Sequence, residues 1–157
     1  MNFNFSDMKG RVEEAYQIAK KAHQGQKDKA GVYYINHPLT VASNVGNGES
    51  AIIVALLHDV VEDTDVTLEE LQTFLLPREL EALRLLTHDK AVPYMDYIEQ
   101  ISHNKLASRV KIADLKNNMD LTRLPVVTEK DRKRVAKYMK AFKFLIRLHG
   151  DTDDTIS

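Results

Sequence analysis

Hydrophobic residues along the chain recur three and four positions apart, which is the spacing of an amphipathic helix. A clear case lies near the N-terminus, where apolar residues between Val12 and Ala22 share one helical face. A strand with one buried face would show strict alternation of apolar and polar residues, and no sustained alternating stretch occurs. The pattern therefore predicts an all-α protein.

Capping residues, glycines and prolines divide this pattern into about seven or eight helices. Ser6 or Asp7 can cap a first helix that stops at Gly25, and Thr67 with Glu70 forms the capping-box pattern of a later one. The expected helices cover approximately residues 7–24, 37–45, 50–63, 68–75, 77–88, 94–102, 105–121 and 129–147. Nothing in the sequence separates them, so we expect one compact domain over residues 1–150, followed by a polar tail at 151–157.

The apolar run of residues 50–57 continues without a break into a polar segment that contains His58, Asp59, Glu62 and Asp63. Carbonyl groups at the end of a helix carry partial negative charge, so carboxylates placed there are repelled by the helix dipole and by one another. A bound cation would remove this repulsion. We therefore expect a positive charge beside this segment.

Two further polar residues occur in apolar surroundings: His37 at the start of the second helix, and Asp114 in the segment VKIADL. Taken singly, His37 can be a capping or core histidine, and Asp114 can pair with an arginine. Together with His58 and Asp59 they supply two imidazoles and two carboxylates. That set suits manganese, iron, zinc or cobalt better than calcium or magnesium, which prefer oxygen ligands alone.

Glu62 and Asp63 follow one helical turn after His58 and Asp59 in this arrangement. Carboxylates in that position can orient and deprotonate a water molecule whose pKa a metal ion has lowered. The expected chemistry is therefore hydrolysis.

Composition narrows the classes of function. The formal net charge of -1 and the pI near 6.6 give no indication of nucleic-acid or membrane binding. The absence of cysteine excludes disulfides and thiolate metal sites. The longest uninterrupted apolar run, AIIVALL, is too short to span a bilayer, and the first residues lack an apolar signal core. We expect a cytoplasmic protein, for which a homo-oligomer remains an open alternative.

The segments HQGQ, YINHPLTVA, ALLHDVVEDT and VKIADLKNNMDL occur in the order found in HD-domain metal-dependent phosphohydrolases. Within that family the chain resembles the guanosine polyphosphate hydrolase domain of RelA/SpoT-type enzymes and the stand-alone small alarmone hydrolases, between Ala15 and Leu124. The resemblance implies an HD-domain helical bundle with one bound metal ion, usually manganese. The residues that match the family's ligands are His37, His58, Asp59 and Asp114.

The same resemblance implies a guanosine-3′,5′-bis(diphosphate) 3′-pyrophosphohydrolase in which Glu62 and Asp63 handle the attacking water and Asn118 contacts the nucleotide. Lys27 and Lys29 are the nearest candidates by motif order to bind the substrate phosphates. The family usually carries an Arg-Lys pair in this loop, with the arginine packing on the base, whereas Asp28 stands at that position here. An adenine alarmone, a dinucleotide cofactor or a nucleoside monophosphate is therefore the alternative substrate. A third hypothesis is a module that binds nucleotides without hydrolysing them.

Other basic residues are assigned mainly to the surface. Lys111 and Lys116 flank Asp114, but helical spacing turns them away from its face by about 60 to 160°. The many bases of the last helix surround an apolar stripe that includes Met139 and Leu145, which favours a solvated basic face. The alternative is that part of this helix reaches the mouth of the pocket or a subunit contact.

Overall fold

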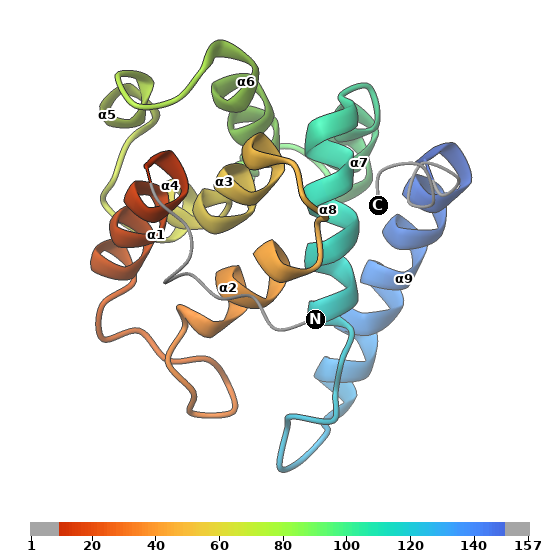
Figure 1. Ribbon diagram of the computed structural model, residues 1–157. Coiled ribbons are helices and arrows are strands. Elements are labelled where there is room, and N and C mark those ends of the chain that lie inside the picture. The colour runs from red at the N-terminus through yellow and green to blue at the C-terminus, as the bar shows by residue number, and fades with distance from the viewer. Residues whose placement is uncertain (1–9, 150–157) are drawn as a thin grey trace.

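The computed structural model describes residues 10–149, which form a helical bundle without a β-strand (Figure 1). The all-α prediction is thus confirmed, whereas the caps proposed at Ser6 and Asp7 and the tail at 151–157 lie outside the described residues. No helix in this part of the chain is long and apolar enough to cross a bilayer. The helices are α1 (Arg11–Ala22), α2 (Asn36–Ser43), α3 (Glu49–Leu57), α4 (Val60–Asp63), α5 (Leu68–Gln72), α6 (Pro77–Leu86), α7 (Tyr94–Ser102), α8 (Lys105–Asn118) and α9 (Glu129–His149).

Several helix ends follow directly from local side-chain chemistry. The hydroxyl of Thr67 accepts a hydrogen bond from the amide of Glu70 at 3.2 Å and caps α5. At the start of α9 the hydroxyl of Thr128 accepts from the amide of Asp131, whose carboxylate accepts in turn from the amide of Thr128. This reciprocal pair is a capping box. Gly25, with φ of 83°, lies just beyond the end of α1 in a conformation that favours glycine.

The prediction of one unbroken helix through Asp63 is wrong, because α3 ends at Leu57 and α4 begins at Val60. The Nδ1 atom of His58 lies 2.6 Å from the carbonyl oxygen of Ala55. In a continuous helix that oxygen would accept a hydrogen bond from the backbone amide of Asp59. The imidazole takes its place, and the chain turns at the two residues that carry the site.

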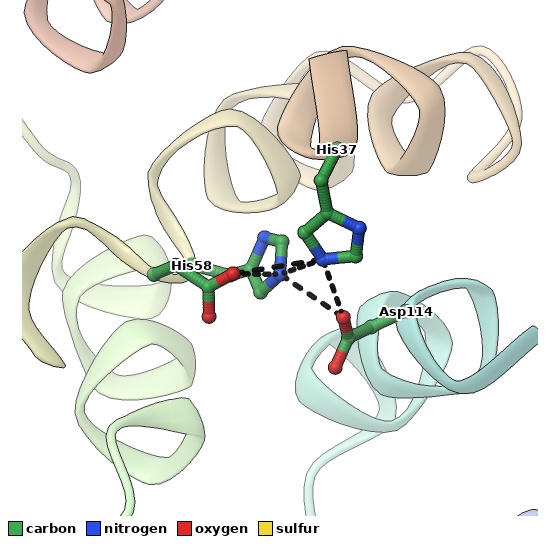
Figure 2. A group of neighbouring side chains, drawn as sticks. His37, His58 and Asp114 are labelled. Atoms are coloured by element: carbon green, nitrogen blue, oxygen red, sulfur yellow. Dashed lines mark hydrogen bonds and ion pairs between the residues drawn. The ribbon is translucent and has the colours of Figure 1, made fainter. Parts of the chain in front are cut away.

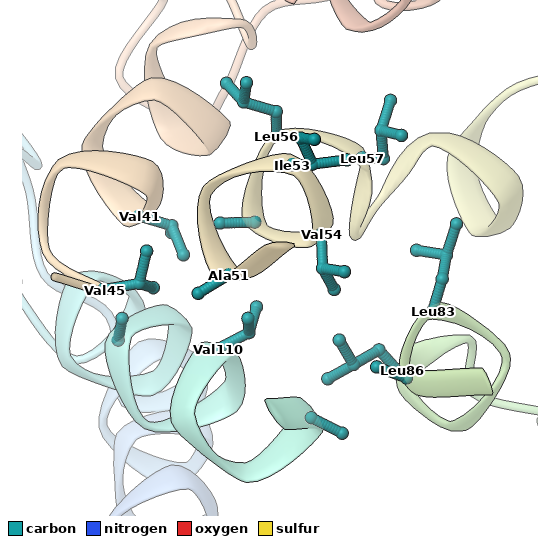
Figure 3. Close-up of a cluster of buried hydrophobic side chains, with 14 of the residues drawn as sticks. Val41, Val45, Ala51, Ile53, Val54, Leu56, Leu57, Leu83, Leu86 and Val110 are labelled. Carbon is teal, nitrogen blue, oxygen red and sulfur yellow. The ribbon is translucent and has the colours of Figure 1, made fainter. Parts of the chain in front are cut away.

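The hydrophobic core is centred on α3, whose residues 51–57 are all buried. This helix packs against α1, α2, α6 and α8. Figure 3 shows its side chains surrounded by Val41 from α2, Leu83 from α6 and Val110 from α8. Truncating a fully buried leucine such as Leu56 to alanine costs about 2–5 kcal/mol. The core therefore fixes the end of α3, where the polar residues begin.

The last helix, α9, lies along α8 and α7 on the outside of the bundle (Figure 1). Leu145 in its predicted apolar stripe is buried, as expected. Met139 is 37% exposed, contrary to that prediction, and Ala141 is buried instead. The buried face is narrower than the hydrophobic pattern indicates because α9 contacts the bundle along one side only.

Candidate metal centre and active-site cleft

The structure brings together the four side chains selected from the sequence as metal ligands. They come from α2, from the turn between α3 and α4, and from α8, and their ligating atoms all lie within 4.8 Å of one another. The Nε2 atom of His37 is 2.8 Å from Oδ1 of Asp114 and 3.2 Å from Nε2 of His58. Figure 2 shows the two imidazoles and the carboxylate of Asp114 pointing toward one another. Asp59 completes the group, with its Oδ2 atom 3.1 Å from Nε2 of His58.

Neighbouring oxygen atoms determine which nitrogen of each imidazole faces this cluster. The Nδ1 atom of His58 lies 2.6 Å from the carbonyl oxygen of Ala55, and Nδ1 of His37 lies 2.6 Å from Oδ1 of Asn117. Because carbonyl oxygens only accept hydrogen bonds, each Nδ1 carries a proton. In the neutral ring the lone pair is then on Nε2, directed at the cluster, which is the usual arrangement of a metal-ligating histidine.

The electrostatics of the cluster require a positive charge. Burial alone would raise the pKa of Asp114, but the Lys111 ammonium and His58 hold it well below its usual value. Burial would lower the pKa of His58, and Asp59 and Asp114 instead raise it well above the usual range. Two Nε2 atoms and two carboxylates thus converge in a space where nearby positive charge stabilises the ionised carboxylates. The donor set fits one divalent metal ion of the manganese, iron, zinc or cobalt class.

A second layer of polar groups holds the carboxylates in place. The Tyr34 hydroxyl donates to Oδ2 of Asp59 at 2.6 Å, and the Asn118 amide donates to Oδ1 of Asp114 at 3.0 Å. Lys111 donates to Oδ2 of Asp114 at 2.9 Å. The expectation that Lys111 turns away from Asp114 is therefore wrong, because residues three apart on a helix are neighbours and a lysine is long enough to bend across.

Lys116, in contrast, does turn away from the cluster. It is exposed, and its Nζ atom lies 5.9 Å from the centroid of the Phe142 ring on α9.

The cluster opens into a polar cleft of about 340 Å³ that is also lined by Glu62 and Asp63. Burial raises the pKa of the Glu62 carboxyl, and the hydrogen bond from the His88 amide at 2.7 Å opposes this only in part. Burial and the negative charge of Asp59 also raise the pKa of Asp63. A carboxylate with a raised pKa is a stronger base. Both carboxyl groups thus line the cleft and have a raised pKa, two properties that a proton acceptor requires.

A hollow of about 270 Å³ adjoins the cleft, with Asn118 and Tyr138 lining both. Lys29 lines the hollow, and its Nζ atom is 3.4 Å from Oδ1 of Asp131. Lys27 is not among the residues that line either space, and its Nζ atom lies 5.3 Å from the centroid of the Tyr33 ring. The hollow thus contains one of the two predicted phosphate-binding lysines.

Asp28 also lines the hollow, and its carboxylate accepts three hydrogen bonds from within the chain. Its Oδ1 atom accepts hydrogen bonds from the backbone amides of Ala30 and Val32 at 2.8 and 3.0 Å. Its Oδ2 atom accepts a hydrogen bond from the guanidinium of Arg123 at 3.1 Å. The residue that departs from the family pattern therefore shapes its own loop and holds an arginine at the rim.

Several site residues were not identified from the sequence. Lys137 and Tyr138 of α9 line the cleft, and Arg134 of the same helix lines the hollow. Their spacing of three to four residues marks one helical face, which is the available signal. The sequence left open whether α9 reaches the pocket, and these residues do so, although Lys137 is exposed like most other bases of the helix. Asn117, three residues after Asp114, carries a similar signal.

The fold and the site define a class: a helical domain that clusters two histidines with two aspartates, and both aspartates line a polar cleft. The family model described as HD domain matches residues 15–104, and this chain belongs to that family. The match includes three of the four clustered residues and ends before Asp114, which α8 brings to the site.

Known proteins of this kind are similar over most of the chain. A guanosine-3′,5′-bis(diphosphate) 3′-pyrophosphohydrolase of Aquifex aeolicus is 35% identical over 80% of this chain, which spans 19% of that protein. The human guanosine-3′,5′-bis(diphosphate) 3′-pyrophosphohydrolase MESH1 is 38% identical over 70% of this chain and 69% of its own length. A solved structure of a metazoan ortholog of SpoT, described as hydrolyzing ppGpp, superposes with a TM-score of 0.73 at 25% identity, covering 94% of this chain and 89% of the other.

Proposed function

We propose that this chain is a metal-dependent 3′-pyrophosphohydrolase of guanosine 3′,5′-bis(diphosphate) or of a nucleotide closely similar to it. The observation that carries the proposal is the cluster of four side chains able to ligate a metal ion, two of which, Asp59 and Asp114, line the same polar cleft as Glu62 and Asp63. The pyrophosphohydrolases of Aquifex aeolicus and human, at 35% and 38% identity, support the substrate class.

The metal ligands in this proposal are His37, His58, Asp59 and Asp114, and manganese is the proposed ion. When bound, such an ion acts as a Lewis acid on a phosphate oxygen and lowers the pKa of water. Asn117 and the Ala55 carbonyl orient the two imidazoles toward it, and Tyr34 orients Asp59. The chain thus supplies a pre-arranged set of donors.

The proposed reaction breaks the bond between the 3′-oxygen of the ribose and the inner phosphorus of the 3′-diphosphate. The oxygen of water forms a new bond to that phosphorus, its proton passes to Glu62 or Asp63, and the leaving 3′-oxygen takes up a proton. The products are pyrophosphate and a nucleotide with a free 3′-hydroxyl. The raised pKa values of both carboxyl groups make this proton uptake easier than for an ordinary carboxylate.

The nucleoside is proposed to lie in the hollow that adjoins the cleft, with Asn118 at the boundary between them. Lys29 and Arg134 are then positioned to meet the 5′-phosphates. Asp28, held by Arg123, favours a second candidate, a substrate with another base such as an adenine alarmone.

A substrate assay tests both candidates. Protein supplied with manganese is offered guanosine tetraphosphate, its adenine counterpart and simple nucleotides, and release of pyrophosphate or phosphate is recorded. We expect pyrophosphate release from guanosine tetraphosphate. Release only from the adenine compound favours the second candidate. If no nucleotide releases pyrophosphate or phosphate, the assignment as a hydrolase is contradicted, and the hypothesis of a nucleotide-binding module is favoured instead.

A further inference from the structure

Charges of opposite sign are distributed unevenly in the cleft. Its lining residues include two lysines, Lys111 and Lys137, together with the carboxylates of Asp59, Glu62, Asp63 and Asp114. Carboxylates repel a phosphate group, whereas ammonium groups attract it. An anionic group that enters the cleft is therefore drawn toward the lysines and away from Glu62 and Asp63.

Lys137 is available to bind such a group. Within residues 10–149 it takes part in none of the ion pairs, whereas Lys111 is bound to Asp114. Its Nζ atom lies 4.5 Å from the ring centroid of Tyr94 and 5.5 Å from that of Tyr138. Aromatic faces attract an ammonium group without neutralising its charge. The two rings therefore hold Lys137 at the cleft while its charge stays free for a ligand.

The hydroxyl of Tyr94 is a second uncommitted group in the same cleft. Its oxygen is buried and finds no hydrogen-bond partner among the described residues. The neighbouring Tyr97, in contrast, donates to the carbonyl of Leu86 at 2.6 Å. Burial raises the pKa of Tyr94 to about 12, so the hydroxyl keeps its proton and can donate. A buried donor without an acceptor is costly, and a ligand oxygen would satisfy it.

We propose that Lys137 and the Tyr94 hydroxyl bind the outer phosphate of the substrate's 3′-diphosphate. This proposal rests on the proposed function. It extends that function to the outer phosphate, which is the group that distinguishes a 3′-diphosphate from a 3′-monophosphate. The outer phosphate takes no part in the bond that breaks. It stays attached to the inner phosphate, and the two are released together as pyrophosphate. These two residues therefore determine a preference for a 3′-diphosphate over a 3′-monophosphate.

Calorimetric titration with inorganic pyrophosphate and with inorganic phosphate tests this site on the manganese-loaded protein. Lys137→Met removes the charge but keeps most of the side-chain stem, and Tyr94→Phe removes only the hydroxyl. Lys140→Met, one turn further along α9 and exposed, is the matched control. We expect Lys137→Met to weaken pyrophosphate binding about 10- to 100-fold, the range for a hydrogen bond to a charged group. Tyr94→Phe should weaken it by several-fold.

Binding of inorganic phosphate should change less than threefold in both variants, and Lys140→Met should bind both anions as the wild type does. The proposal is overturned if Lys137→Met and Tyr94→Phe bind pyrophosphate normally, or if they lose pyrophosphate and phosphate equally. Because the ring of Tyr94 remains in Tyr94→Phe, this variant decides the question should Lys137→Met fail to fold.

Kinetics provide a second readout. The ratio of kcat/KM for a nucleotide 3′-diphosphate to that for the matching 3′-monophosphate should fall in both variants and not in Lys140→Met. If the wild type hydrolyses neither nucleotide, the proposed function fails, while the pyrophosphate titration still decides whether the anion site exists.

Discussion

The histidines of the cluster owe their role to groups that are themselves not ligands. Each imidazole is fixed by an oxygen at Nδ1, from the Ala55 carbonyl for His58 and from the Asn117 amide for His37. Rotation of either ring would move Nε2 out of the cluster and leave a buried polar atom unpaired. The orientation of the His37 ring therefore depends on Asn117.

Replacement of Asn117 by alanine should weaken manganese binding about 10- to 100-fold, the usual effect of losing a hydrogen bond behind a ligating histidine. Titration against a competing chelator measures this. Lys116→Ala, an exposed neighbour on α8, serves as the control and should leave the affinity unchanged. Unaltered binding in Asn117→Ala would show that His37 does not need this bond.

Glu62→Gln and Asp63→Asn should each lower the turnover number by about 10²-fold or more, because each removes a positioned proton acceptor. Metal content should stay at the wild-type level, since neither residue belongs to the four-residue cluster. Asp65→Asn, exposed and two residues further on, should keep full activity. Loss of the metal together with the activity would make Glu62 or Asp63 a ligand and contradict the assigned role.

At the scale of helices, sequence signals predicted boundaries well where the cause is local. The predicted limits of 94–102 agree with α7, which follows Pro93, and the Thr128 cap of α9 is confirmed. The break between α3 and α4 was not predictable from periodicity, because it depends on one rotamer of His58 competing for the Ala55 carbonyl. The position of Lys137 at the cleft depends on how α9 packs against α7 and α8, which no local pattern specifies.

Three helices are joined by one buried carboxylate, that of Glu79 at the start of α6. It accepts hydrogen bonds from the guanidinium of Arg11 in α1, from the Ser50 hydroxyl in α3 at 2.6 Å, and from the Leu76 amide at 2.9 Å. Burial alone would raise the pKa of Glu79, but these donors together hold it below its usual value. The ionised form is therefore the one that stabilises the fold.

Glu79→Gln should lower the free energy of unfolding at pH 7 by about 2 kcal/mol, since hydrogen bonds to a charged group are lost. A group with a lowered pKa in the folded state stabilises above its unfolded pKa, near 4.3 for glutamate, and loses that contribution as the pH falls through the folded value. The difference between wild type and Glu79→Gln should thus shrink below about pH 4 in urea unfolding. Glu69→Gln, exposed on α5 and in none of the ion pairs among residues 10–149, should unfold like the wild type at pH 7 and below about pH 4. A difference for Glu79→Gln that stays constant with pH would contradict the argument.

For the whole molecule, the cluster links α2, α8 and the turn after α3, which are separate segments of the bundle. An ion bound to all of them would bind the folded chain and not the unfolded one. Metal binding and global stability are therefore expected to be coupled.

Addition of manganese to chelator-treated protein should raise the free energy of unfolding by about 2.7 kcal/mol at a concentration 100 times the Kd. In a chain of this size that corresponds to an increase in Tm of about 5–10 °C, measurable by calorimetry. Asp114→Asn should abolish the increase, because it removes the charge that α8 contributes. A wild-type Tm that is insensitive to manganese, zinc, iron and cobalt would mean that the cluster holds no such ion.

The separation of His37 and Asp114 by 77 positions along the chain also has a consequence for the protein during its synthesis. A nascent chain that has emerged as far as Asp59 carries three of the four clustered residues, but Asp114 is still to be translated, and Lys137 on α9 follows later still. Since ribosomes add about 5–20 residues per second, this delay lasts several seconds. A newly made chain is therefore expected to lack both the complete cluster and the finished cleft until α8 and α9 have left the ribosome and packed against the other helices.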